Sequence, residues 1–166
     1  MNSLLGHGLI YDCEIVTPDG EVITFSDHNL LPQVSIDFIA GLIMGSGAPN
    51  ANWYLGLYEG NYVPTSGVTA ADLPGVVGEC TAYSQATRPS WSATYDGVSL
   101  ISNLSSKAVF SLNAPKTIYG AFIVSNSTKA GNTGLLLSIA RFSTPRALEA
   151  GTEFGVAAGL TLTSAT

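Results

Sequence analysis

The sequence predicts a mainly β protein of one domain, an antiparallel β-sandwich with one short helix in its N-terminal half. Three observations predict this fold class. The 166 residues suit a single domain that buries roughly two-thirds of its unfolded surface. From residue 53 onward, short segments with alternating apolar residues recur at intervals of about 8–15 residues. Turn residues separate these segments, which is typical of antiparallel sandwiches and barrels.

The first element is a β-hairpin that follows a short arm. Pro18 presets the backbone of the turn, and Asp19-Gly20 supplies residues that tolerate positive φ; the flanking segments are LIYDCEIVT and VITF. Ahead of it, MNSLLGHGL is interrupted by glycines. We expect residues 1–9 to form a flexible arm that offers Leu4, Leu5 and Leu9 to a partner.

A helix follows the hairpin. Apolar residues recur there at helical spacing and predict a face that packs on the core: Val34, Phe38, Ile39, Leu42 and Ile43. Pro32 suits the first turn and Gly45 the end.

The rest of the chain predicts strands, with one long polar connection over residues 59–79. Thr69 and Asp72 predict a short capped helical turn within it, ended by Pro74-Gly75. The expected strands are WYLGLY, ECTAYSQ, SWSATYDG, VSLISNL, KAVFSLN, KTIYGAFIVSN, GLLLSIARF and TEFGVAAGLTLTSA.

Two of these strands differ in how many faces they bury. The last strand predicts one apolar face, made by Phe154, Val156, Ala158, Leu160 and Leu162, and one of small or polar residues. Residues 118–124 are apolar on both faces, with Tyr119 expected beside Ala121 and Ile123. Such a strand is central in a sandwich, or its second face meets another subunit.

Aromatic residues provide the best candidates for an interface. Strand alternation assigns Trp53, Leu55 and Leu57 to the core, and Tyr54 and Tyr58 to the opposite face. The alternative is that these tyrosines cover that face beneath a loop. Arg and Trp are frequent in binding hot spots, although RPSW also suits the start of a strand. The candidate interface residues are Leu4, Leu5, Leu9, Tyr54, Tyr58, Tyr62, Arg88, Trp91 and Tyr119.

Composition limits the partners. Charged residues are 11% of the chain, against about 25% in ordinary domains, so either uncharged polar residues solvate the surface or other protein chains cover it. We expect a homo-oligomer, with a dimer favoured over a trimer. A net charge of −6 without a basic run argues against nucleic acid. Without a signal-peptide pattern or a long apolar run, we expect no export and no membrane insertion.

Catalytic patterns are weak. His7 and His28 are the only histidines, and neither GxSxG nor HExxH occurs. The twelve acidic residues fall mainly at turns or strand edges, which favours a solvated role over a catalytic pair. Cys13 and Cys80 lie far apart and are expected to be free thiols. We therefore expect no enzyme, no metal and no cofactor.

Several segments carry a resemblance to a known family: the N-terminal hairpin with its helix, NWYLGLYEGNYVP, TRPSW, IYGAFIVSN and GLLLSIARFSTPRALEAG. Their order resembles the capsid cement, or decoration, proteins of tailed bacteriophages. The resemblance implies a jelly-roll-like sandwich in which TPRALEAG forms a corner before the last strand.

It also implies a structural role. The protein would be made in the host cytoplasm, bind the major capsid protein on the outer surface of the virion and stabilise the shell. The alternative is a receptor- or glycan-binding module of the phage tail, because β-sandwiches with surface aromatics also bind sugars.

Overall fold

The structure is a computed structural model, which describes residues 8–162. Its elements are β1 (Ile10–Val16), β2 (Val22–His28), α1 (Gln33–Ile43), β3 (Tyr54–Tyr58), η1 (Ala70–Asp72), η2 (Leu73–Val77), β4 (Glu79–Cys80), β5 (Thr94–Tyr95), β6 (Leu100–Ser102), η3 (Leu104–Ser106), β7 (Ala108–Ser111), β8 (Lys116–Val124), β9 (Leu136–Leu148) and β10 (Glu153–Thr161). Strands predominate, so the predicted fold class is confirmed.

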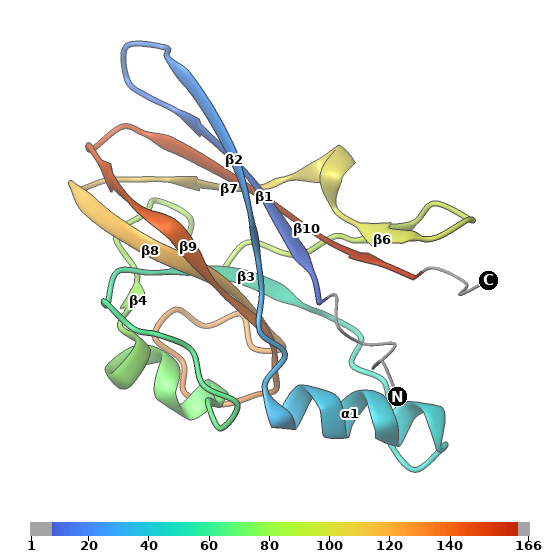
Figure 1. The fold of residues 1–166 in the computed structure, drawn as a ribbon. Coiled ribbons are helices and arrows are strands. Elements are labelled where there is room, and N and C mark those ends of the chain that lie inside the picture. The colour runs from blue at the N-terminus through green and yellow to red at the C-terminus, as the bar shows by residue number, and fades with distance from the viewer. Residues whose placement is uncertain (1–7, 163–166) are drawn as a thin grey trace.

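Two antiparallel sheets face each other (Figure 1). The larger sheet has the order β2-β1-β10-β6-β5, and β7 also pairs with β10. The smaller sheet has the order β4-β3-β8-β9. The main core lies between them and includes Tyr11, Ile15, Leu57, Ile123 and Phe154. The protein is thus a β-sandwich, while the jelly-roll-like arrangement stays a prediction.

A third layer covers the second face of the smaller sheet. In Figure 1, α1 and the green helical turns of η1 and η2 lie below β3, β8 and β9. A second apolar cluster fills this space, where Val68, Leu73 and Val77 from the long connection pack with Phe122 and Val124 of β8. The two-faced character of β8 therefore arises within one chain. It does not require another subunit.

In the N-terminal half of the chain, the predicted turn of the hairpin is confirmed, and the predicted start and packing of the helix are corrected. Gly20 adopts φ +91° between β1 and β2, and Gly45 adopts φ +69° just beyond α1. Pro32 is the N-cap of α1 and precedes its first turn. The predicted packing holds for Val34, which contacts the second core, and for Phe38, which packs against Trp53. It is wrong for Leu42 and Ile43, which are 37% and 82% exposed because they face away from the sheet.

The long connection contains its predicted cap but not its predicted end. The backbone N–H of Thr69 donates to the Asp72 carboxylate at 2.8 Å, as the sequence indicated. Pro74-Gly75 was expected to stop the turn. Instead the chain coils through them as η2 and ends at Gly78, which has φ +75°.

An irregularity between β8 and β9 corrects the face assigned to Tyr119. Their register shifts between Ile118 and Gly120, which pair with Arg146 and Arg141. This bulge moves Tyr119 to the second core, whereas Ile118 packs in the main core. Pro145 lies in the unpaired stretch, where its missing N–H breaks no ladder bond. The expected TPRALEAG corner is therefore still part of β9 as far as Leu148.

Two expected strands are much shorter than their patterns. ECTAYSQ forms only the two residues of β4, and SWSATYDG only the two of β5. The last strand, by contrast, buries Phe154, Val156 and Ala158 as predicted. Leu160 packs partly against the core, while Leu162 lies beyond the strand and is exposed.

Candidate functional site: the outer face of the larger sheet

Three of the predicted interface residues lie inside the protein. Leu9, Tyr58 and Arg88 are at most 3% exposed, so none is available on the surface for a partner. Leu9 belongs to the main core and therefore not to an arm. Leu4 and Leu5 fall outside the described residues.

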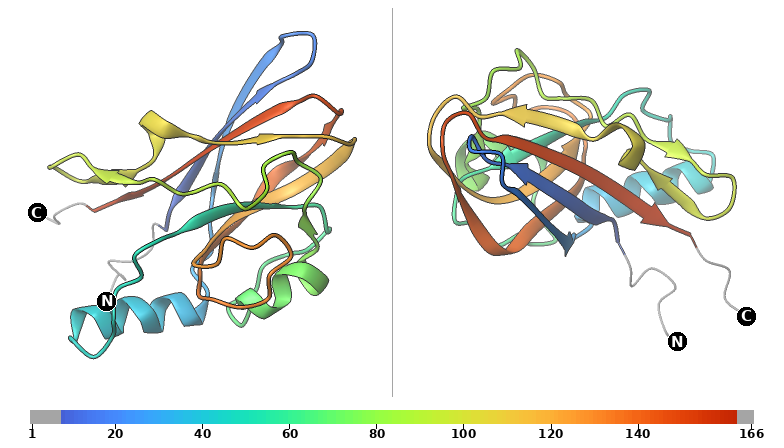
Figure 2. Two further views of the ribbon diagram at one scale, coloured as in Figure 1. Left: turned by 180° about the vertical axis from the view of Figure 1, so that it is seen from behind. Right: turned by 90° about the horizontal axis from the view of Figure 1, so that it is seen from above.

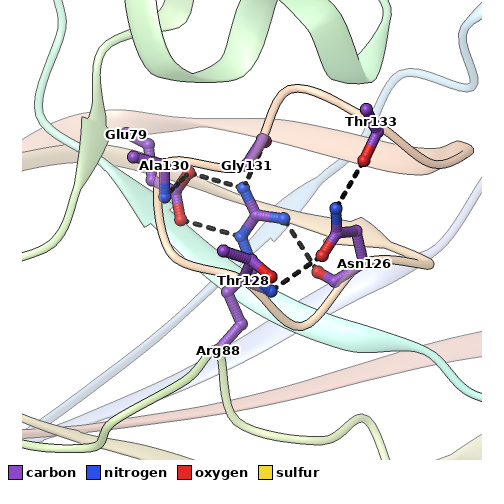
Figure 3. A network of polar contacts seen from close by, with 7 residues as sticks. All are labelled: Glu79, Arg88, Asn126, Thr128, Ala130, Gly131 and Thr133. Carbon is purple, nitrogen blue, oxygen red and sulfur yellow. Dashed lines mark hydrogen bonds and ion pairs between the residues drawn. The ribbon is translucent and has the colours of Figure 1, made fainter.

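Arg88 is buried, and its ion pair and hydrogen bonds hold the loop between β8 and β9 (Figure 3). Its Nε and Nη2 donate to the Glu79 carboxylate at 2.8 and 2.6 Å. Its guanidinium also donates to the carbonyls of Asn126 and Gly131 at 2.8 and 2.9 Å. Glu79 in turn accepts the Ala130 N–H at 3.1 Å. The hot-spot residue type is therefore used for internal structure, although no strand starts at Arg88 and the next one, β5, begins at Thr94.

Tyrosines 58, 62 and 119 come together beneath the long connection. Tyr62 and Tyr119 pack, half-buried, against the second core, which contains Tyr58. Arg141 joins the group, since its guanidinium lies 5.4 Å from the ring centre of Tyr119 and donates to the Tyr62 carbonyl at 2.6 Å. These rings anchor the loop over the smaller sheet, which was the alternative to an interface.

Tyr54 and Trp91 are half-buried and close in space. Tyr54 pairs with Val124 in the sheet and forms an isolated bridge with Ser90. The indole N–H of Trp91 donates to the Ala158 carbonyl at 3.0 Å. Of the nine candidates, these two retain partly exposed rings outside the tyrosine cluster.

The outer face of the larger sheet is not crossed by another described segment, although its positions Gly155 and Ala157 are buried between the side chains of the neighbouring strands. In the right-hand view of Figure 2, no described segment crosses over β1, β10 and β7. The outer positions of β10 carry Gly155, Ala157 and Gly159, which alternate with the buried residues of the core face. A strand without large outer side chains leaves a trough between its neighbours.

We call this trough the outer groove. It consists of two adjoining hollows of about 500 and 170 Å³, and Leu104 lines both. Its floor is Gly155, Ala157 and Gly159, and its walls are Ile10, Asp12, Glu14 and Val16 on one side and Leu100, Leu104, Lys107 and Val109 on the other. Ile10, Leu104 and Val109 in the walls are exposed, whereas Gly155 and Ala157 in the floor are buried, so an extended segment of another protein would rest on the apolar walls.

Charge in the outer groove is predominantly negative. Lys107 neutralises Glu14, with Nζ to Oε2 at 2.9 Å. Asp12 accepts a hydrogen bond from Ser26, and Glu153 accepts one from Ser111. Three carboxylates and one ammonium line the groove, so it favours a partner segment that carries positive charge.

The described residues contain little that resembles a reactive centre. Burial raises the pKa of both cysteine thiols, Cys13 and Cys80, which keeps them protonated and unreactive. Within residues 8–162, no group of three or more His, Cys, Asp and Glu side chains is placed to hold a metal ion. Over the same range, no helix has the length and apolar character needed to cross a membrane.

Comparison of the chain with known protein families, with curated proteins and with solved structures found no match.

The outer groove was not among the predicted sites, although the sequence contained its signal. The small residues between Phe154, Val156 and Ala158 were visible as the second face of the last strand. The strands that flank these small residues could not be identified without the strand order.

Proposed function

We propose that the protein is a non-enzymatic structural protein of a virion, which binds the outer surface of the capsid and stabilises the shell. The outer groove is the contact surface in this proposal, and the major capsid protein is the partner. The observation that carries it is the uncovered face of β1, β10 and β7, with exposed apolar walls in a chain of sparse charge.

The dimensions of this face favour a contact repeated in many copies. A seven-residue strand rises about 23 Å, and the three neighbouring strands β1, β10 and β7 span about 10 Å. The face therefore offers roughly 220 Å² before side-chain relief is counted, less than the ~800 Å² per partner of a standard interface. Each contact is weak by this measure. An oligomer that engages several capsid subunits at once would hold more tightly through its effective concentration.

The shell-binding proposal is tested with purified protein and empty shells assembled from the major capsid protein of the same genome. We expect Leu104→Ser to lower the affinity about tenfold, because it removes an apolar wall that contact would bury. Added salt should weaken binding, since the groove attracts positive charge. The measurement is co-sedimentation.

Val76→Ser is the matched control. Val76 is exposed like Leu104 and lies in a short helical turn, η2, in the layer on the other side of the smaller sheet (Figure 1). It should leave binding unchanged. Equal effects of the two substitutions would reject the outer groove as the contact surface, and shells that bind no protein would reject the function.

The same proposal includes a homo-oligomer, with a dimer favoured, and α1 supplies a second surface for it. Ile36, Ala40 and Ile43 form an outward stripe on this helix, whose single charged residue is Asp37. Beside this stripe, Gln33 and Asp37 are also exposed and bond to each other, so a second copy would bury the apolar stripe along one side of the helix. Ile43→Asp should convert the oligomer to monomer in light scattering. Val98→Asp, at an equally exposed site, should not.

The alternative function, a receptor- or glycan-binding module of the phage tail, places the protein elsewhere in the particle. Electron microscopy of particles with and without the protein separates the two. Extra density on the capsid supports the first proposal, and density at the tail supports the second.

A further inference from the structure

Both tryptophans of the chain line one pocket at the end of the sandwich where α1 leads into β3. The pocket has a volume of about 400 Å³, within the roughly 300–1,000 Å³ of small-molecule sites. Two chain segments and one strand residue form it: Ala51, Asn52 and Trp53; Ser90, Trp91, Ser92 and Ala93; and Ile101 of β6. It lies outside the outer groove and shares no lining residue with it.

Hydrogen bonds and ring packing hold the two tryptophans in place. The backbone N–H of Trp91 donates to the backbone carbonyl of Trp53 at 2.8 Å, which ties the two lining segments together. The Trp91 indole N–H bonds the Ala158 carbonyl, and the ring of Trp53 packs edge-on against Phe38 at 5.7 Å between centres. Rings held in this way lose little conformational freedom when a ligand binds.

The remaining lining is polar and uncharged. Asn52, Ser90 and Ser92 are exposed and supply an amide and two hydroxyls, which both donate and accept hydrogen bonds. Among residues 8–162, none of the side chains that line the pocket is charged. With a net charge of −6 on the chain, a phosphate or carboxylate ligand would find no ion-pair partner among these residues.

This lining matches the chemistry of a neutral sugar ring. A pyranose presents C–H bonds on its faces and hydroxyls around its edge, so its faces suit indole rings and its edge suits amide and hydroxyl groups. We propose that this pocket binds one ring of a neutral saccharide, stacked on Trp53 or Trp91 and hydrogen-bonded by Asn52. The site would act wherever the protein is located in a particle.

Intrinsic fluorescence is a direct test, because the whole tryptophan emission of the chain arises from this pocket. The full-length protein is titrated with glucose, galactose, mannose, N-acetylglucosamine and their short oligomers. We expect a saturable change in emission with at least one neutral sugar and none with glucose 6-phosphate. Absence of saturation with every neutral sugar, or a response to adenosine alone, would overturn the proposal.

A substitution pair separates binding from folding. Asn52→Ala should weaken sugar binding about fivefold, the effect of one hydrogen bond. Asn132→Ala alters another exposed asparagine, in the loop between β8 and β9, and should leave binding unchanged. Thermal melting confirms that both variants fold. Equal affinity of the two variants for the sugar would show that this pocket is not the site.

Discussion

Replacement of Arg88 by methionine tests whether this residue serves the fold or an interface. The guanidinium donates two hydrogen bonds to Glu79 and one each to the Asn126 and Gly131 carbonyls, and the side chains of the ion pair are 0% exposed. Methionine fills similar volume but supplies no donor. Glu79 then keeps only the Ala130 N–H, at 3.1 Å, in a buried place.

The expected loss follows from that uncompensated carboxylate. Removal of one partner from a buried ion pair costs about 3–5 kcal/mol, a large part of the roughly 5–15 kcal/mol that stabilises a typical domain. For a chain of this size the same loss lowers Tm by roughly 6–20 °C. Urea denaturation and thermal melting both measure it.

Two control variants make the result interpretable. Lys116→Met removes one partner of the Lys116–Glu59 pair, whose side chains are 29% and 33% exposed, and should cost under about 1 kcal/mol. The double variant Glu79→Leu, Arg88→Met should recover most of the lost stability, because no buried charge remains. If Arg88→Met were no more destabilising than Lys116→Met, the structural role of Arg88 would be refuted. An interface role predicts normal stability with weaker shell binding.

Two further predictions concern buried tyrosines. Tyr58 is fully buried, and its hydroxyl has no hydrogen-bond partner among the described residues. Tyr58→Phe should therefore change the free energy of unfolding by under about 1 kcal/mol in urea denaturation, whereas Tyr58→Ser should cost about 3–5 kcal/mol. Little loss with Tyr58→Ser would show that the ring is not part of the core. Burial raises the pKa of Tyr11, Tyr58 and Tyr83 above the ordinary value of 10. The contribution of these groups to folding stability is therefore complete below pH 10 and falls as the pH rises further. Tyrosinate absorbance and circular dichroism should therefore show these three ionising together with alkaline unfolding, and their ionisation in a folded protein would contradict the burial.

The uncovered surfaces could be predicted only in part. Sparse charge indicated that other protein covers some of the chain, and the last strand showed a face of small residues. The candidates drawn from aromatic and arginine content were different residues, and most of them anchor loops. Side-chain type does not distinguish a ring that packs under its own loop from one that meets a partner, because both bury the same apolar area.

The sequence by itself determined the features that depend on neighbouring residues. These are the fold class, the turn at Gly20, the end of α1 at Gly45, the Thr69 cap and the buried face of the last strand. Each follows from backbone preference or from alternation over a few positions.

Only the tertiary structure decided what covers each face. Alternation shows that β8 has two apolar faces, but the path of residues 59–78 determines that the second face is covered within the chain. The bulge that turns Tyr119, the burial of Arg88 beside Glu79 and the outer groove along β10 all depend on residues distant in sequence. Contacts of that range are set by strand order and register, which local patterns do not encode.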